Sequence, residues 1–469
     1  MPPAPSFAAV DTPTKDLRGF LALLQAESPG DIVTISQEVD PDEEAIALAR
    51  NLEARGDHPV LWFENIRGTN FPVVVNVHAS AQRLALALGT SRGQLNATYV
   101  ERLEHLIPPV MEANGPVHDC IISGGEVDLA KLPLLTPFAE CPAPYISGGI
   151  MVVKDSDSGI RNLSYIRLMV TGRNTMTMHA APFQHTDTVI RNAARRGQTC
   201  AAAIFMGYHP AVALGALAKV PFDIDEYDCC GALLQEPLPL VKCRTVDLEV
   251  PAHAEMVLEA EIDPKELIYE GPYGEFTGFA LPADLQPTVR IKSISHRSPP
   301  IYQDVVAGGR EHLLMGKIPK EATQERYLKS MFPMVRRVHM PLSGRGRFHL
   351  VISVGDHRPA EVRRLILAAY TNDHFIKHVY VVDADIDVED DAAVLSAFAC
   401  CFQGDRDMVM ITQMPGSSLD PSGYPGPTGT KLGFDCTRKG TGFPPRFHMD
   451  PAILAKMAPA RFLPRSGQP

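Results

Sequence analysis

The chain has 469 residues, of which 45% are hydrophobic and 21% are charged, as expected for a globular protein with a large core. No apolar run approaches the roughly 20 residues that span a bilayer. A net charge of -11 without a long basic run argues against nucleic acid and anionic membranes as partners. The start of the chain lacks the pattern of a signal peptide, and the nine scattered cysteines suggest neither a disulfide framework nor a zinc ribbon. We therefore expect a cytoplasmic protein with a small-molecule ligand.

Strand and helix signals alternate over residues 1–117, which predicts a small N-terminal α/β domain. Asp40, Pro41 and Glu43 are typical of a helix start, with Asp40 as the N-cap and Pro41 at the first helical position. The strands are expected at residues 31–35, 60–63 and 73–77, and the helices at residues 40–52 and 81–88.

Short β-branched runs separated by Gly, Pro and Asp fill residues 118–316. Their spacing is that of a barrel or sandwich rather than of βαβ units, so we expect a mostly antiparallel β domain with inserted helices. The strands are expected at residues 149–153, 164–170, 203–205 and 288–292.

The α/β alternation resumes over residues 317–469, which predicts a C-terminal α/β domain. Its Pro/Gly-rich stretch at residues 415–429 is expected to be irregular, and Asp450 is expected to cap a final helix that begins at Pro451. The other strands are expected at residues 348–354 and 378–383, and the other helices at residues 359–370 and 391–401.

The hexapeptide from Glu270 to Glu275 places two carboxylates on either side of a tight turn. Pro272 fixes its own φ, and Gly271 and Gly274 are able to adopt positive φ. Two carboxylates in one partly buried site do not both ionise easily, so one of them would stay protonated and could donate a proton. The alternative is a solvated turn with two unrelated glutamates, and the hexapeptide alone leaves both open.

Asn162, His185 and Glu226 are candidate metal ligands in the same predicted domain. Together they offer two oxygens and one nitrogen, a mixed set that suits manganese or magnesium when phosphate oxygens complete the shell. Taken singly, each of the three residue types is more often structural or solvent-exposed than a ligand.

Several short motifs follow one another in the order and spacing of a known family. Besides the hexapeptide, the motifs include Asn162-x-x-x-x-Arg167, Gln184-His185, Gly207-x-His209-Pro210-Ala211, Glu226-x-x-x-x-Gly231-Ala232-Leu233, Leu240-Val241-Lys242-Cys243, Val250-Pro251-Ala252-x-Ala254-Glu255, Asp383-x-Asp385-Ile386-Asp387 and Gly429-Thr430-Lys431-Leu432-Gly433-Phe434-Asp435. With these motifs the chain resembles the UbiD decarboxylases, which use prenylated flavin mononucleotide (prFMN), over residues 31–437.

The resemblance implies an α/β and α+β multidomain fold. A central, mostly antiparallel split β-barrel would bind the flavin between an N-terminal α/β domain and a C-terminal α/β oligomerisation domain. Asn162, His185 and Glu226 would bind a divalent cation, manganese in most members, that holds the prFMN phosphate, often with potassium nearby. The cofactor-binding residues would be Asn162, Ser164, Tyr165, Ile166, Arg167, Gln184, His185 and Glu226.

The implied reaction is reversible, non-oxidative decarboxylation of an aromatic, heteroaromatic or α,β-unsaturated acid through a covalent prFMN adduct. Loss of CO2 leaves an sp2 carbanion that no side chain stabilises, and prFMN supplies the electron sink. Arg167, Glu270 and Glu275 would form a Glu-Arg-Glu network in which Glu275 delivers the proton, helped by apolar surroundings that raise its pKa. The five-residue interval would place Asn162 and Arg167 on opposite faces of one strand.

Two other functions remain open from the residues alone. They are a flavin- or metal-binding protein without decarboxylase activity, and a metal-dependent hydrolase with Glu275 as its base. The resemblance also implies a flavin prenyltransferase as cofactor supplier, and a homodimer or dimer-based hexamer in which the final helix lies against a second subunit. The sequence does not identify the acid, and selectivity is expected near Phe276, His312, Leu313 and Met315.

Overall fold

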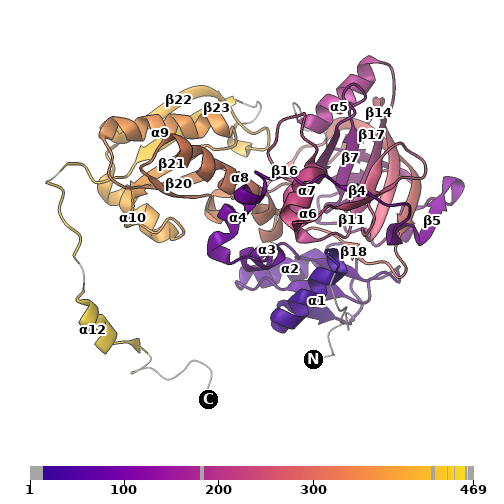
Figure 1. Cartoon of the computed structure of the whole chain (residues 1–469), viewed down its shortest axis with the longest axis horizontal. Helices are drawn as coiled ribbons and strands as arrows, with labels where there is room; N and C mark the ends of the chain where they lie inside the picture. The colour runs from indigo at the N-terminus through magenta and orange to yellow at the C-terminus, as the bar shows by residue number, and fades with distance from the viewer. Residues whose placement is uncertain are drawn as a thin grey trace.

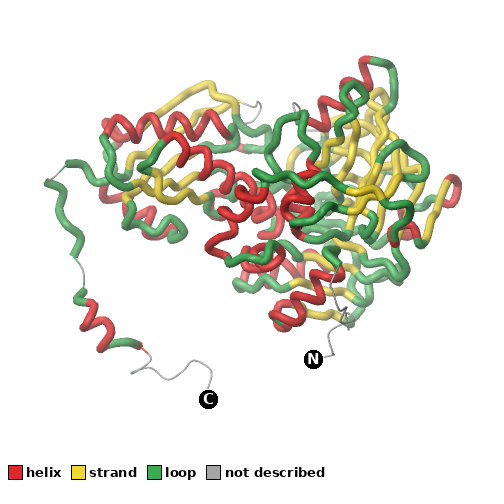
Figure 2. Tube along the Cα trace, viewed as in Figure 1, coloured by secondary structure: helices red, strands yellow, loops and turns green. Residues whose placement is uncertain are grey.

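The computed structural model describes residues 14–179, 184–423, 428–440, 442–447, 449–459 and 462. An N-terminal α/β part and a central part with a large sheet lie together, and helix α8 (Arg310–Met331) leads from them to a C-terminal α/β part (Figure 1). Figure 2 shows the larger group of strands in the central part and a separate group in the C-terminal part. None of the helices described is long and apolar enough to cross a membrane. The predicted multidomain architecture is confirmed, while the exact domain limits stay a prediction.

The N-terminal part is built on a four-stranded sheet in the order β1-β2-β3-β18. Leu17, Phe20 and Leu24 of the first helix are fully or almost fully buried against this sheet, in a cluster that includes Trp62 and Val74. The elements are α1 (Leu17–Glu27), β1 (Ile32–Ile35), α2 (Glu44–Ala54), β2 (Val60–Phe63), β3 (Val73–Val75), α3 (Ala81–Ala87), α4 (Leu95–Arg102) and β18 (Tyr302–Gln303).

The helix predicted from Asp40 begins later, at Glu44. The Thr136 amide donates to the Pro41 carbonyl at 3.1 Å, and the Glu43 amide donates to the Thr136 carbonyl at 2.9 Å. These bonds tie residues 41–43 to a distant segment, and Glu43 has a φ of +65°, so the first helical turn cannot form there. The predicted N-cap role of Asp40 was therefore wrong.

The central part is a nine-stranded sheet, curled and open, in the order β6-β9-β10-β17-β14-β11-β7-β8, with β5 also pairing with β17. Every strand pair in it is antiparallel, which confirms the predicted strand arrangement. Its strands are β5 (Cys120–Ser123), β6 (Tyr145–Ile146), β7 (Ile150–Lys154), β8 (Arg161–Tyr165), β9 (Leu168–Val170), β10 (Thr175–Met178), β11 (Cys200–Met206), β14 (Met256–Glu270) and β17 (Asp284–His296).

Successive residues of the central strands enter two different hydrophobic cores. In β11, Ala202 and Ile204 belong to one core, whereas Ala203 and Phe205 belong to the other. Because side chains alternate across a strand, this division shows that both faces of the sheet are buried. The remaining elements of the central part are β4 (Val110–Met111), α5 (His185–Arg195), α6 (Pro210–Ala216), α7 (Glu226–Leu234), β12 (Pro239–Lys242), β13 (Glu249–Pro251), β15 (Tyr273–Gly274) and β16 (Ala280–Leu281).

The C-terminal part has a five-stranded sheet in the order β19-β20-β21-β23-β22. Its three middle strands are parallel, and the two outer strands run antiparallel to their neighbours. The elements are β19 (Val335–His339), β20 (His349–Val354), α9 (Pro359–Asn372), β21 (His378–Asp383), α10 (Asp391–Cys401), α11 (Gly404–Asp407), β22 (Met408–Pro415), β23 (Thr428–Asp435) and α12 (Pro451–Lys456). The sequence analysis missed β19, β22 and β23.

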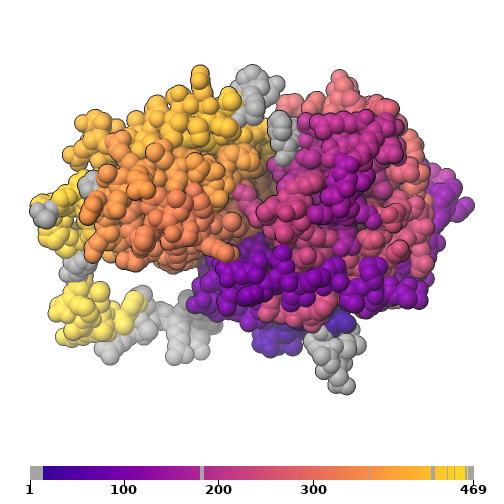
Figure 3. All heavy atoms as spheres, turned by 45° about the horizontal axis from the view of Figure 1, so that its top comes forward, coloured from indigo at the N-terminus to yellow at the C-terminus, as the bar shows by residue number. Residues whose placement is uncertain are grey.

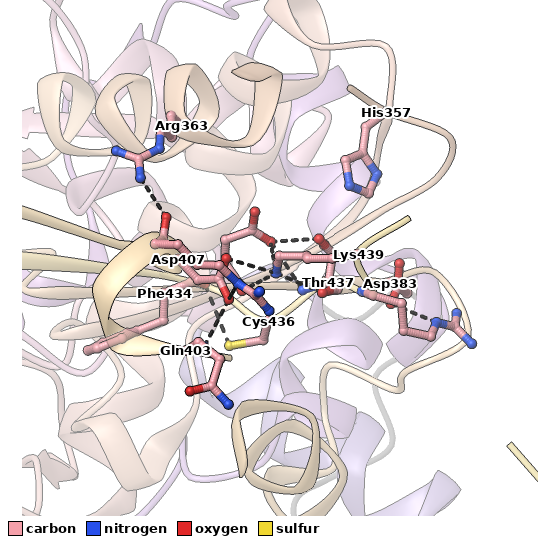
Figure 4. Close-up of polar contacts among 12 residues, drawn as sticks. His357, Arg363, Asp383, Gln403, Asp407, Phe434, Cys436, Thr437 and Lys439 are labelled. Atoms are coloured by element: carbon pink, nitrogen blue, oxygen red, sulfur yellow. Dashed lines mark hydrogen bonds and ion pairs between the residues drawn. The ribbon is translucent and has the colours of Figure 1, made fainter. Parts of the chain in front are cut away.

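A polar cluster holds the end of β23 near the start of β22 (Figure 4). The Lys439 ammonium donates to the Thr437 carbonyl at 2.7 Å and lies 3.8 Å from the Asp407 carboxylate. Asp407 in turn accepts a hydrogen bond of 2.8 Å from the Gln403 amide. Each of these bonds stays within the C-terminal part, so the cluster stabilises the sheet and does not reach the central part.

Glu321 of α8 is a buried carboxylate that joins separate parts of the chain. It accepts hydrogen bonds from the Asn96 side-chain amide at 2.8 Å and the Met340 backbone amide at 2.6 Å, and it lies 3.2 Å from the Lys317 ammonium. Burial acts to raise its pKa, but Lys317 and His339 outweigh burial and lower the pKa to about 2.

Glu321→Gln is expected to lower the free energy of unfolding at neutral pH by about 3 kcal/mol, because the folded pKa of about 2 lies below the ordinary value of 4.5. A depressed pKa stabilises the fold above the unfolded pKa, and this stabilisation is lost as the pH falls toward the folded pKa. Chemical denaturation of wild type and variant at about pH 7 and pH 3 should therefore show a smaller difference at the lower pH. Glu325→Gln, on the same helix but partly exposed, is the matched control. An equal difference at both pH values would contradict this account.

Candidate active site

Arg167, from the link between β8 and β9, and Glu270 and Glu275, from the two ends of the hexapeptide, form one buried network. The Arg167 guanidinium donates to Glu270 through two bonds, Nε to Oε1 at 2.9 Å and Nη2 to Oε2 at 2.8 Å. Its Nη1 donates to Oε1 of Glu275. Glu270 is 1% exposed and Glu275 is 6% exposed, so the alternative of a solvated turn is excluded.

The two glycines of the hexapeptide are needed for different reasons. Gly271 adopts a φ of +97°, which residues other than glycine rarely adopt. Gly274 does not have positive φ, contrary to the expectation. A Cβ at Gly274 would instead collide with the Phe138 ring. The turn therefore holds Glu270 and Glu275 in place both by its backbone conformation and by close packing.

Arg167 and Asn162 are not on the same strand. Asn162 lies within β8, which ends at Tyr165, and Arg167 precedes β9, which begins at Leu168. The two-residue period of a strand does not relate them, and the prediction of opposite faces of one strand was wrong. The short link between the strands directs the guanidinium to the network instead.

The pKa of Glu275 is lowered, not raised. Burial is the largest single effect and acts to raise it, but Arg167, His312, His179 and Arg347 together outweigh burial and lower the pKa. The prediction that apolar surroundings raise this pKa was therefore wrong for the structure as it stands. A ligand that excludes water and places its own carboxylate beside Arg167 would shift the balance toward the protonated form.

Aromatic side chains surround the network. Tyr273 belongs to the hexapeptide, but no sequence motif indicated Tyr145 or His179 as part of the site. The Tyr145 hydroxyl donates to Oε1 of Glu270 at 3.1 Å, and the His179 ring lies 3.8 Å from Oε2 of the same carboxylate. The Tyr273 ring centroid lies 4.7 Å from the Arg167 guanidinium carbon. These contacts hold Arg167 in one orientation, because cation–π packing and hydrogen bonds fix it from several sides.

Asn162, His185 and Glu226 are brought together by β8 and by the first residues of α5 and α7. The Asn162 side-chain amide donates to Oε1 of Glu226 at 2.8 Å, and His185 Nδ1 lies 3.9 Å from the same oxygen. Thr186 donates to the Asn162 carbonyl oxygen at 2.7 Å, and the Leu163 amide donates to Oε2 of Glu226 at 3.0 Å.

This set fits a divalent cation. Glu226 is 3% exposed, and among the described residues its only basic partner is His185. A buried carboxylate without a lysine or arginine partner is costly, and a bound cation would compensate its charge. Among the described residues, no three His, Cys, Asp or Glu side chains lie close enough together to bind a metal ion. A metal bound here would therefore need an amide oxygen, such as that of the Asn162 side chain, as a further ligand.

A cavity of about 510 Å³ connects the network with the Asn162, His185 and Glu226 set. Its walls come from the central part, from α8 and from the C-terminal part, which lie against one another in Figure 3. All predicted cofactor-binding residues line it, namely Asn162, Ser164, Tyr165, Ile166, Arg167, Gln184, His185 and Glu226.

Other predicted residues divide between the cavity wall and positions behind it. Glu275, His312 and Met315 line the cavity, whereas Glu270 lies behind Arg167, and neither Phe276 nor Leu313 reaches the wall. The sequence analysis missed three basic residues of the wall, which are Lys219, Lys320 and Arg347. Spacing on one helix could have revealed Lys320, because it follows His312 and Gly316 at intervals of four along α8.

Comparison with known protein families places the chain in a class of decarboxylases. Profiles of the family described as 3-octaprenyl-4-hydroxybenzoate carboxy-lyase, UbiD, match residues 23–103 with the N-terminal domain, 109–310 with the Rift-related domain and 313–436 with the C-terminal domain. The chain belongs to this family, which confirms the resemblance.

Individual relatives cover nearly the whole chain. The anhydromevalonate phosphate decarboxylase of Methanosarcina mazei is 33% identical over 424 residues, which is 90% of this chain and 96% of that protein. The UbiD-class enzyme HmfF from Pelotomaculum thermopropionicum, in complex with FMN, has a TM-score of 0.89 at 34% identity and covers 96% of this chain and 100% of its own. An evolved dimeric form of HmfF in complex with prFMN has a TM-score of 0.87 at 33% identity, with the same coverage.

Proposed function

We propose that the protein is a prFMN-dependent carboxy-lyase that reversibly decarboxylates an aromatic, heteroaromatic or α,β-unsaturated acid. One observation carries this proposal: the paired Arg167 and Glu275 line the same cavity as the Asn162, His185 and Glu226 set. A guanidinium and a carboxyl group that can carry a proton then adjoin a site for a cation and a phosphate. The flavin complexes of the similar HmfF structures support the choice of cofactor.

When bound, prFMN supplies the electron sink for the charge that develops as CO2 leaves. Arg167 binds the substrate carboxylate by charge-assisted hydrogen bonds and orients it. Glu270 holds Arg167 through two hydrogen bonds from behind the cavity wall, so it is a positioning residue. The Glu275 carboxyl gives its proton to the carbon that has lost CO2, and in the carboxylation direction it removes that proton.

Asn162, His185 and Glu226 would hold a manganese ion that neutralises the cofactor phosphate, with potassium nearby. The metal need not touch the substrate. A flavin prenyltransferase would supply the cofactor, and we retain the cytoplasm as the expected location.

The test is a CO2-release screen of aromatic, heteroaromatic and cinnamate-type acids, with protein produced alongside a flavin prenyltransferase. Release from at least one acid, by protein with a flavin-like absorbance spectrum, is the expected result. Fully flavin-loaded protein that releases no CO2 from any of the three classes would contradict the decarboxylase function.

We expect the final helix, α12, to contact a second subunit. Figures 1 and 3 show the segment that carries it extending away from the rest of the C-terminal part. Its apolar residues Ile453, Leu454 and Met457 are 49%, 57% and 53% exposed, and such residues usually cover an apolar surface. A two-fold dimer is the commonest closed arrangement.

Light scattering of the full chain and of a chain that ends at Phe447 tests this expectation. The full chain should have the mass of a dimer or of a dimer-based hexamer, and the shortened chain should have a lower mass. A monomeric full chain, or an unchanged mass after truncation, would show that α12 is not the contact.

A further inference from the structure

Arg347 brings a positive charge to the cavity wall that the chain itself does not neutralise. It precedes β20 in the C-terminal part, and its guanidinium carbon lies 4.1 Å from the centroid of the buried Phe276 ring. Among the described residues, no carboxylate or carbonyl oxygen accepts a hydrogen bond from this guanidinium, and Glu275 and Asp373 act on it only through charge. The ring supports the flat face of the group, which leaves its N–H edge available to a ligand.

Arg167 and Arg347 line the same cavity but differ in their surroundings. The pKa of Arg167 is raised, because Glu270 and Glu275 outweigh the effect of burial. Burial lowers the pKa of Arg347 to about 10, and Glu275 and Asp373 offset it only in part. A partly desolvated cation without a direct partner costs free energy, and an anionic ligand would recover that cost.

His312 and Lys320 extend the same wall along α8. The Gly308 amide donates to His312 Nδ1 at 3.2 Å, so a neutral ring carries its proton on Nε2 and is a donor there. Lys320 lies 2.7 Å from Asp373, but Lys219 lies 3.3 Å from the same carboxylate. One carboxylate therefore serves two ammonium groups, which leaves excess positive charge at this end of the cavity.

We propose that Arg347 and His312 bind a second anionic group of the substrate, a carboxylate or a phosphate-type group remote from the carboxylate that is lost. This inference rests on the proposed decarboxylase function and names the class of acid, which is an acid with at least two anionic groups. Arg347 and His312 both interact electrostatically with Glu275, the proton donor, so the subsite adjoins the reacting carbon. The cofactor phosphate is expected instead at the Asn162, His185 and Glu226 set.

Gly316 gives an independent way to move the Arg347 guanidinium without removing its charge. A Cβ at residue 316 would collide with the end of the Arg347 side chain, which is flexible and able to shift. Gly316→Ala should therefore displace the guanidinium while α8 stays folded. Arg347→Met removes the charge but keeps an apolar side chain of similar length against Phe276.

The experiment uses three matched acids and the flavin-loaded protein. The acids are 4-carboxycinnamate, 4-phosphonocinnamate and 4-carbamoylcinnamate, whose substituent at position 4 is uncharged. The measured quantity is the ratio of the kcat/KM values of each charged acid and the amide. Binding of each acid is also measured by calorimetry. The variants are Arg347→Met and Gly316→Ala, and Arg336→Met is the control because Arg336 is exposed and lies outside the cavity wall.

Wild type is expected to favour at least one charged acid over the amide by roughly 10- to 100-fold, the range of a hydrogen bond to a charged group. Which acid is favoured distinguishes a carboxylate subsite from a phosphate subsite. The preference should fall toward 1 in Arg347→Met and Gly316→Ala, and persist in Arg336→Met. Equal kcat/KM values of the wild type for the charged acids and for the amide would overturn the proposal.

Two further outcomes separate this inference from the proposed function. If no acid is decarboxylated but a charged acid still binds more tightly than the amide through Arg347, the anion subsite stands and the proposed reaction fails. If Arg347→Met loses flavin while its substrate preference is unchanged, Arg347 serves the cofactor and the subsite proposal fails.

Discussion

Glu275→Gln is expected to reduce decarboxylation by about 10²–10⁴-fold or more, because it removes the proton that general acid catalysis requires. The amide keeps the size of the side chain, and its carbonyl oxygen can still accept the hydrogen bond from Arg167. Flavin and manganese should therefore stay bound, as measured by the absorbance spectrum and by metal analysis. The rate is measured as CO2 release at saturating acid.

Glu266→Gln is the matched control for this variant, since it makes the same change on β14 at an exposed ion pair with Arg290. It should leave the rate close to that of wild type. Near-normal turnover in Glu275→Gln would show that Glu275 is not the proton donor. Loss of flavin together with activity would show that Glu275 supports cofactor binding instead.

His185→Ala should weaken the retention of metal and flavin together. The ring is one of three donors around the proposed cation, and that cation would join the protein to the cofactor phosphate. Changes in a metal shell typically cost at least 10–100-fold in metal affinity, so the purified variant should be paler and low in manganese. The measurements are the absorbance spectrum and the metal content of protein produced alongside a flavin prenyltransferase.

His357→Ala is the matched control, because His357 lies in the C-terminal part and its ring contacts the Gly355 carbonyl, away from the cavity. This control should retain both metal and flavin. Full occupancy of both in His185→Ala would place the metal elsewhere. Loss of metal with flavin fully retained would show that the metal does not hold the cofactor.

Local sequence signals indicated candidate residues that the structure brings together in the central part. Asn162, His185, Glu226 and the hexapeptide each sit in short motifs whose order indicated the family, and all of them meet around the cavity or directly behind it. The basic end of the cavity could not be predicted in this way. Arg347 is one of two arginines in a Gly-rich loop, and the packing of the C-terminal part against α8 brings it to the wall.

Tertiary contacts also explain the failures on the fold and on the pKa of Glu275. Asp40 stands in a sequence typical of a helix start, but the Pro41 carbonyl and the Glu43 amide that follow it form hydrogen bonds with Thr136 instead of starting a helix. β23 lacks a β-branched run and forms as a strand beside β21 and β22. Glu275 looked like one of two mutually repelling carboxylates, yet Arg167 lies between the two acids and favours the charged form.

The most direct test of the central claim is hydrogen exchange between solvent and product in D2O. The product of decarboxylation, incubated with flavin-loaded protein, should gain deuterium at the carbon that had carried the carboxylate, and Glu275→Gln should abolish that gain. Flavin-loaded wild type that releases CO2 without placing solvent deuterium at that carbon, or Glu275→Gln that exchanges as fast as wild type, would contradict proton transfer by the Arg167 and Glu275 pair.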